Sequence, residues 1–274
     1  MIKSRYPAFP YILFMAIFIV VPLLMVAYFA FTTSGGEFTL SNIIRVKGYI
    51  PVIIKSLFLA FLATVICLVL GYPFAFIMAR KTSNIRRTML MLIMLPMWMN
   101  FLLRTYSWMT ILENNGLINR FFGLFGIGPF EMINTQGAVV LGMVYDYLPF
   151  MIVPLYTVLM KMDNSLIQAA QDLGGNPFQV FTHVVLPLSL PGISTGITMV
   201  FIPSVSTFII SKMLGGGSEL MIGDLIEMQF TGTAYNPNLG AAISFVLMII
   251  ILICMGAMNQ FDSDEDRKEE TVVI

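Results

Sequence analysis

Long stretches of apolar residues without any charge constrain this chain more than any other feature of its sequence. Residues 8–31, 56–79 and 188–211 contain no Asp, Glu, Lys or Arg, and residues 238–260 carry polar amides only near their ends. A helix rises about 1.5 Å per residue, so roughly 20 apolar residues cross a hydrocarbon layer of about 30 Å. Each stretch therefore predicts one transmembrane helix.

The composition supports a protein that lies largely in lipid. Hydrophobic residues make up 58% of the chain and charged residues only 11%, whereas soluble domains carry about 25% charged residues. The 15 basic and 15 acidic residues balance, which argues against the basic face that nucleic acids require. Cys67 and Cys254 lie far apart in apolar runs, so we expect small buried side chains rather than a disulfide or a zinc site.

Two further apolar stretches are each interrupted by a single charge. Residues 88–112 contain Arg104, and residues 136–160 contain Asp146. Both stretches still predict spans because their other residues are almost wholly apolar. We therefore expect an all-α membrane protein with six transmembrane helices.

The positive charges predict the orientation of the spans. The connector between the second and third expected spans is rich in basic residues. The positive-inside rule therefore predicts that this connector and both termini lie in the cytoplasm. We expect an N-terminal helix with an outer loop (1–55), a core (56–260), and an acidic cytoplasmic tail (261–274) that is solvated and irregular. The densest basic cluster of the chain lies in that connector and comprises Arg80, Lys81, Arg86 and Arg87.

The segment 162–187, hereafter the polar hairpin, is too polar to cross a membrane and has the pattern of two short helices. Asn164 or Ser165 can cap a first helix, and Gly174 suits the left-handed residue that ends it. Asn176 and Pro177 then suit the start of a second helix over residues 178–186. The apolar residues of the first helix recur at helical spacing: Leu166, Ala169, Ala170 and Leu173.

Two interpretations of the polar hairpin fit its pattern. An apolar stripe with two adjacent alanines can pack into a groove of a partner protein. Alternatively, the hairpin lies flat on the lipid surface. Its polar face carries few basic residues, which argues against lipid.

The polar hairpin and the residues after it contain a spaced set of small, apolar and proline residues: Gln168-Ala169-Ala170, Gly174, Phe178, Phe181, Val184, Leu186-Pro187 and Pro191-Gly192. With this pattern the segment resembles the EAA loop of ABC-importer permeases. In that family the loop is a coupling helix that sits in a cleft of a cytoplasmic ATPase, and Gln168 stands where the family usually has Glu. The resemblance implies coupling roles for Leu166, Gln168, Ala169, Ala170, Leu173, Gly174 and Phe178.

Four further stretches carry a second resemblance: Leu103–Trp108, Gly116–Asn119, Val144–Met151 and Asn238–Ala242. They resemble the spermidine/putrescine permeases of the PotB type. This resemblance implies a type I (MetI-like) importer fold and the import of polyamines across the cell membrane of a prokaryote. It also implies a second permease, two ATPase subunits that bind ATP and Mg, and an extracytoplasmic binding protein, with no cofactor on this chain.

The sequence contains no G-x-x-x-x-G-K-[ST] motif, so we expect a transport subunit rather than an enzyme. Asp146 is a candidate for the substrate path, because an acid inside a membrane is costly unless it has a function or a partner. It could attract an ammonium group, with Tyr145 or Tyr147 giving a cation–π contact. The alternative is an ion pair with Arg104.

Several other polar residues leave two interpretations open. Ser206 and Thr207 could line the path or bond back to their own helix. Trp98, Tyr106 and Trp108 are expected to be interfacial anchors rather than substrate contacts. The acids Glu219, Asp224 and Glu227 could guide a cation or meet the binding protein. His183 is expected at a surface.

Other functions remain alternatives. The same importer class could carry an amino acid, ferric iron or a phosphonate. An ion-coupled secondary transporter would show inverted repeats and midplane acids in both halves, and this sequence has one such acid and no visible repeat. If the chain were a membrane signalling or scaffold protein, deleting residues 166–174 would leave solute uptake intact.

Overall fold

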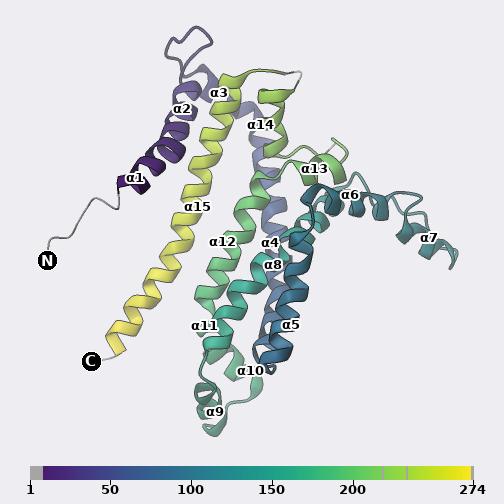
Figure 1. Ribbon diagram of the computed structural model, residues 1–274, viewed down its shortest axis with the longest axis vertical. Helices are drawn as coiled ribbons and strands as arrows, with labels where there is room; N and C mark the ends of the chain where they lie inside the picture. The colour runs from purple at the N-terminus through teal and green to yellow at the C-terminus, as the bar shows by residue number, and fades with distance from the viewer. Residues whose placement is uncertain (1–8, 218, 233, 273–274) are drawn as a thin grey trace. The chain divides into compact units, whose positions relative to one another are not determined.

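The computed structural model describes residues 9–217, 219–232 and 234–272, and of residues 9 and 258–272 only the backbone. All regular secondary structure in this part of the chain is helical (Figure 1). Four helical segments are long and apolar enough to cross a membrane, and two bent helix pairs bring the number to six if each pair counts as one span. The expectation of an all-α membrane protein is confirmed.

The helices follow the apolar stretches of the sequence, with short helices between them. In chain order they are α1 Phe9–Met15, a π-helical turn Ala16–Val20, α2 Val21–Ala30, α3 Ser41–Val46, a 3-10 turn Lys47–Tyr49, α4 Ile50–Ala79, α5 Ser83–Met94, a 3-10 turn Leu95–Trp98, α6 Phe101–Leu112, α7 Leu117–Gly123, α8 Gln136–Lys161, α9 Asn164–Asp172, α10 Pro177–Val180, a π-helical turn Phe181–Val185, α11 Leu186–Leu188, α12 Leu190–Ser206, α13 Ile209–Leu214, α14 Ile222–Thr231 and α15 Pro237–Val272.

The chain forms two compact units. The first contains residues up to 53 together with 225–253. Within it, Asn238 at the start of α15 donates from its side chain to the Phe29 and Thr32 carbonyls at 3.1 and 2.8 Å. Asn42 of α3 donates to the Thr32 carbonyl as well, at 2.9 Å. These buried amides join the end of α2 to α3 and α15.

The second unit contains residues 54–224 and 254–274 and is built around α4, α8 and α12. Its larger core brings together Cys67 and Met78 of α4, Met151 and Leu155 of α8, and Val200 of α12, all fully buried. Cys67 is thus the small buried residue that its apolar surroundings predict. The packing of these three helices holds the unit together by burying apolar surface.

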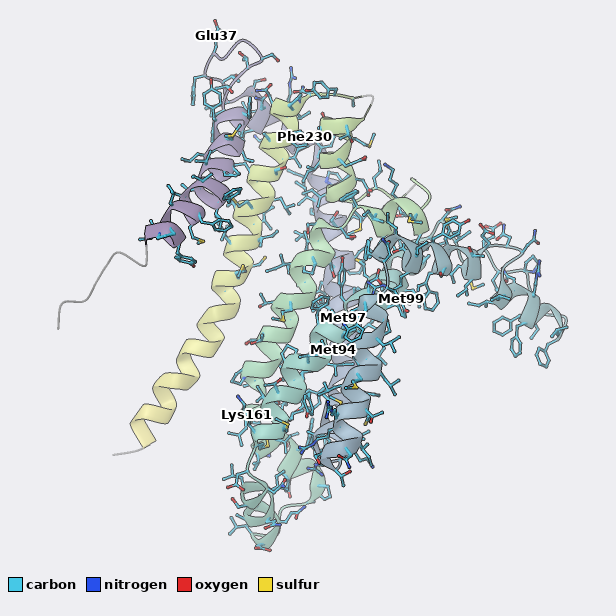
Figure 2. The ribbon with its side chains drawn as sticks, viewed as in Figure 1. Glu37, Met94, Met97, Met99, Lys161 and Phe230 are labelled. Atoms are coloured by element: carbon cyan, nitrogen blue, oxygen red, sulfur yellow. The ribbon has the colours of Figure 1, made fainter. Side chains whose placement is uncertain are left out.

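The expected third span, 88–112, is not one straight helix. The chain is helical from Ser83 to Trp98 and from Phe101 to Gly123, apart from a short turn after Leu112, and the two parts meet at 90°. Asn100 explains the break because its side chain accepts the Leu102 N–H at 2.9 Å and so starts a new helix. Pro96 lacks an N–H and sits in the 3-10 turn before the break. Figure 2 labels Met94, Met97 and Met99 along this bend.

The expected fifth span, 188–211, also differs from the structure in its bounds, because α12 covers only Leu190–Ser206. The helix that begins at Pro177 continues through Pro187 to Leu188 instead of ending before the proline, because the preceding turn is π-helical and changes the hydrogen-bond register. It meets α12 at 63°. Thr207 and Phe208 then interrupt the helix before α13.

The segments between the expected spans also contain helices: α3 and the start of α4 within 32–55, α7 within 113–135, and α14 within 213–237. The backbone of α15 also continues as helix to Val272. The tail is therefore helical over most of the length where we expected an irregular end, and residues 273–274 lie outside the described chain.

We predict that Gly223→Ala destabilises the protein. A Cβ at Gly223 would lie 2.5 Å from the Thr207 carbonyl oxygen and 2.6 Å from that of Ser206. Backbone oxygens cannot move away as flexible side chains do, so we expect a cost of about 1–3 kcal/mol in the free energy of unfolding. Thermal unfolding in detergent measures the effect, and Gly123→Ala, whose Cβ meets nothing within 4 Å, is the control. Equal melting temperatures of the two variants would contradict the close packing of α14 on residues 206–207.

Candidate functional site

The two charges that interrupt the apolar stretches form an ion pair inside the second unit. The Arg104 Nε of α6 lies 2.5 Å from the Asp146 Oδ1 of α8. The residues are only 8% and 2% exposed. Arg104 also donates from Nη1 to the Pro96 carbonyl at 2.9 Å. One guanidinium thus connects α8 to both sides of the bend at residues 99–100.

Aromatic rings surround this ion pair. The Arg104 Cζ lies 5.8 Å from the centroid of the Tyr145 ring and 5.7 Å from that of Phe101. Trp108 packs edge-on against Tyr145 with centroids 5.3 Å apart. The cation that Tyr145 contacts in this structure is therefore Arg104.

Tyr147 connects α8 to the break that follows α12. Its hydroxyl lies 3.5 Å from the Pro203 carbonyl and is hydrogen-bonded to the Thr207 side chain. Thr207 is buried, whereas Ser206 is exposed and donates back to the Ile202 carbonyl at 3.2 Å. Of the two residues left open by the sequence, Thr207 contributes to the cluster and Ser206 bonds to its own helix.

The structure thus brings Arg104, Asp146, Tyr145, Tyr147 and Thr207 together. The ion pair with Arg104, which the sequence left as the alternative for Asp146, is what this conformation shows. Contact of Asp146 with a substrate stays a prediction. The sequence did not predict the hydrogen bonds of Arg104 and Tyr147 to the Pro96 and Pro203 carbonyls. Every residue has a backbone carbonyl, so residue type does not indicate which one accepts a side chain.

The first helix of the polar hairpin begins earlier than its sequence suggested. Asp163, rather than Asn164 or Ser165, caps α9: its carboxylate accepts the Ser165 backbone N–H at 2.9 Å. This backbone hydrogen bond lowers the pKa of the Asp163 carboxyl below its usual value. Asp, Asn and Ser are all favourable N-cap residues. Asp163 takes this role because α9 begins at Asn164.

The turn of the polar hairpin has the predicted punctuation. Gly174 has φ +86°, and the Gly175 N–H donates to the Ala170 carbonyl at 3.0 Å, which is the pattern of a left-handed helix end. Asn176 and Gln179 then form reciprocal hydrogen bonds of 2.8 and 2.9 Å, a capping box that starts α10 at Pro177. The predictions for Gly174, Asn176 and Pro177 are confirmed.

The apolar residues of α9 divide between two faces. Ile167 and Ala170 pack against the larger core of the unit, which corrects the expectation that Ala170 belongs to the outward stripe. Leu166 and Leu173 are 47% and 90% exposed, Phe178 is 74% exposed, and Ala169 and Gln168 are exposed as well. The polar hairpin therefore presents an unpartnered face that we name the α9 face: Leu166, Gln168, Ala169, Leu173 and Phe178.

Other predicted residues are engaged locally. Glu219 forms an ion pair with Lys55, buried Asp224 accepts the Met221 N–H at 2.7 Å, and Glu227 accepts the Thr231 hydroxyl at 3.1 Å. These contacts give the acids structural roles.

The three aromatic residues and His183 differ in how far they are exposed. Trp98 and Tyr106 are 84% and 54% exposed, whereas Trp108 packs against a core of the unit. A role as interfacial anchors stays a prediction. His183 is exposed, as expected. Among the described residues, no group of three His, Cys, Asp or Glu side chains could hold a metal ion.

Comparison with known proteins places the chain in a family. A family model described as "Binding-protein-dependent transport system inner membrane component" matches residues 71–264, a range that includes α8, α12 and the polar hairpin between them. The chain therefore belongs to the family of binding-protein-dependent transport system inner membrane components.

Relatives within this family match nearly the whole chain. A protein of Haemophilus influenzae named "Spermidine/putrescine transport system permease protein PotB" is 36% identical over 92% of both chains. The protein of the same name from Escherichia coli is 37% identical over 86% of this chain and 90% of its own. The Escherichia coli "Inner membrane ABC transporter permease protein YdcU" is 32% identical over 82% of this chain and 76% of its own.

A solved structure confirms the fold. A chain in the crystal structure of a bacterial ABC transporter involved in the import of the acidic polysaccharide alginate superimposes with a TM-score of 0.77, with 93% of each chain covered and 15% identity. At this identity the likeness shows the fold alone. The expected type I importer permease fold is thus confirmed, and the chain is a multi-pass membrane protein.

We predict that Asp146→Asn destabilises the protein more than the double variant Arg104→Gln, Asp146→Asn. The single change leaves a buried guanidinium without its counter-charge, at a cost of about 3–5 kcal/mol, whereas the double change removes both charges. Thermal unfolding of the purified variants measures the difference. The reverse single change, Arg104→Gln, should fall near Asp146→Asn. If the double variant were the least stable of the three, the ion pair would not be what holds the bend in place.

Proposed function

We propose that this chain is a transmembrane permease subunit of an ATP-driven ABC importer and forms part of the path for polyamines such as spermidine and putrescine. The observation that carries this proposal is the similarity of 36–37% over most of the chain to relatives named as spermidine/putrescine permeases. The fold and the exposed α9 face support the transport mechanism. The ATPase, a second permease and a binding protein are partners in this proposal.

The α9 face is the proposed contact with the ATPase. Its apolar side chains, Leu173 and Phe178 above all, are exposed at a polar turn, where they have no packing partner among the described residues. An apolar helix face of this kind is buried when it lies in a groove of a partner. ATP hydrolysis then takes place on the partner, and this chain transmits motion.

The polar hairpin has rigid connections through which motion could reach the spans. Phe181 packs edge-on against Tyr72 of α4 with centroids 5.6 Å apart. The Tyr72 hydroxyl lies 2.8 Å from the hydroxyl of Ser189, at the bend between α11 and α12. In the proposal, a shift of α9 therefore moves α4 and α12 together rather than unfolding a loop.

The cluster around Asp146 is the proposed contact with the substrate. A polyamine carries ammonium groups, and these can replace the guanidinium of Arg104 as partners of the carboxylate. Tyr145 already contacts a cation through its ring in this structure. The ion pair would then serve as a closed state that an arriving ammonium opens, because a ligand shifts an equilibrium only through its preference for one state.

We predict that Leu173→Asp abolishes co-purification of the ATPase and polyamine uptake while the subunit remains folded. A carboxylate in the centre of the α9 face would have to be desolvated in the ATPase groove. Leu124→Asp is the matched control, because Leu124 is 82% exposed but follows α7. We would abandon the coupling role of the α9 face if Leu173→Asp bound the ATPase and imported substrate as the parent does.

We predict that cells lacking their own polyamine uptake regain it when they express this chain with its partner subunits. Labelled spermidine and putrescine report the uptake, with amino acids, ferric iron and phosphonate as competitors. Competition by one of these solutes at lower concentration than either polyamine would overturn the substrate assignment.

The double variant Arg104→Gln, Asp146→Asn tests the role of the cluster in the same assay. It removes the carboxylate without leaving a buried charge. We expect its apparent affinity for spermidine to fall about tenfold, since a charged contact contributes about 1.5 kcal/mol or more. An unchanged affinity at a normal protein level would remove Asp146 from the substrate path and leave it a structural role.

A further inference from the structure

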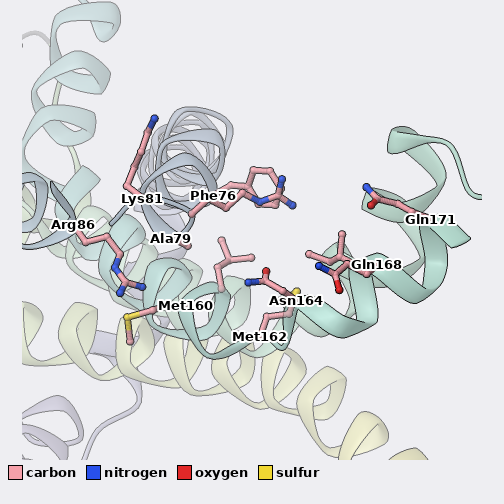
Figure 3. Close-up of a pocket in the computed structure, with 12 residues that line it drawn as sticks. Phe76, Ala79, Lys81, Arg86, Met160, Met162, Asn164, Gln168 and Gln171 are labelled. Carbon is pink, nitrogen blue, oxygen red and sulfur yellow. The ribbon is translucent and has the colours of Figure 1, made fainter. Parts of the chain in front are cut away.

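A pocket lies where the connector between α4 and α5 meets the polar hairpin (Figure 3). Its volume is about 540 Å³, which is large enough for the headgroup of a lipid or a similar small molecule. The proposed transport function does not use the basic connector between α4 and α5. The polar residues that line the pocket are Arg80, Lys81, Arg86, Asn164, Gln168 and Gln171.

The pocket has an uncompensated positive charge. Its lining includes three cationic side chains and no Asp or Glu. Within the part of the chain whose side chains are described, none of these three cations forms an ion pair. Two acids adjoin lining residues in sequence, Asp163 and Asp172, but neither lines the pocket, and Asp163 caps α9 instead. Cations gathered in one concave site attract an anion.

One of the cations is held in place without a counter-charge. The Arg80 Cζ lies 4.0 Å from the centroid of the Phe76 ring, so the guanidinium stacks on an aromatic face. Stacking restricts the side chain while leaving its N–H donors free for a ligand. Arg86 is half-buried, so its position is also restricted. Two of the three cations, Arg80 and Arg86, are therefore restricted before a ligand arrives.

The hairpin side of the pocket adds neutral donors. Asn164, Gln168 and Gln171 each carry a side-chain amide that can donate to an anion, and Figure 3 shows these three residues across from Lys81 and Arg86. A carboxylate at position 168 would neutralise part of the charge, whereas the amide leaves the positive charge in place. The lining thus suits an oxyanion that accepts several hydrogen bonds.

The remaining lining is apolar and marks the end of two spans. Phe76, Met160 and Met162 line the pocket, α4 ends at Ala79, and α8 ends at Lys161. Basic pockets between the ends of transmembrane helices suit lipid headgroups, because the phosphate meets the cations while the glycerol and chains lie along apolar side chains.

We propose that this pocket binds a phosphate-bearing anion, as the headgroup of an anionic phospholipid or as free phosphate. Arg80, Lys81 and Arg86 hold the phosphate oxygens, and the amides of α9 close the site from the hairpin side. Because α9 also presents the proposed coupling face, the bound anion ties the hairpin to the α4–α5 connector.

Native mass spectrometry of the purified transporter tests this proposal. The complex is released from vesicles that contain phosphatidylglycerol and phosphatidylcholine, and the bound lipids are counted. We expect preferential retention of phosphatidylglycerol, reduced about tenfold in the variant Lys81→Gln, Arg86→Gln. Arg87→Gln is the matched control, because Arg87 belongs to the same connector but does not line the pocket. Equal retention of the two lipids without phosphate binding, or equal loss in the control, would overturn the proposal.

A second variant guards against a general loss of structure. Gln171→Glu keeps every cation but places a carboxylate in the lining, at a residue outside the α9 face, so we expect it to lower retention as well. Titration with inorganic phosphate separates the two sources: displacement of the lipid, or binding without it, identifies free phosphate as a ligand. A lipid signal that disappears whenever the ATPase is assembled would instead show that the partner fills the pocket, and would overturn the proposal. Spermidine uptake, measured in parallel, reports the proposed transport function separately.

Discussion

Inside a lipid bilayer, every backbone N–H and carbonyl needs a hydrogen-bond partner from the protein, and this constraint governs where the helices of this chain can bend. At residues 99–100, Asn100 accepts the Leu102 N–H and Arg104 donates to the Pro96 carbonyl. At the second bend the Ser189 hydroxyl donates to the Leu186 carbonyl at 2.8 Å. At both bends, side chains thus add hydrogen bonds to those of the backbone, since the Met99 and Ser189 N–H groups also donate to the Pro96 and Leu186 carbonyls.

The same bends organise the two regions that we connect with transport. Helix α8 carries Asp146 against the first bend and leads directly into the polar hairpin. Helix α12 begins after the second bend, and Thr207, the residue that follows it, contacts Tyr147 of α8. The charged cluster and the hairpin thus share two helices that are packed against each other along their length. A displacement at one region has a direct route to the other through that packing.

Much of this architecture could be predicted from residue patterns. The apolar stretches located the spans, and Gly174, Asn176 and Pro177 located the turn of the hairpin, because such signals act over only a few residues. The bends were missed because hydropathy alone does not separate one straight helix from two bent ones. Asn100 was the local signal at the first bend, yet an Asn inside an apolar run also fits an uninterrupted helix.

The sequence by itself determined that the chain crosses a membrane as helices and has a helix-glycine-helix hairpin, because length, apolarity and capping chemistry are local properties. Only the tertiary structure decided which partners the polar groups meet. Asp146 pairs with Arg104, which lies 42 positions earlier in the chain, and three cations of the α4–α5 connector share a pocket with the amides of α9. Those pairings depend on how the helices pack, and packing energy is distributed over many weak contacts between distant residues that no short pattern records.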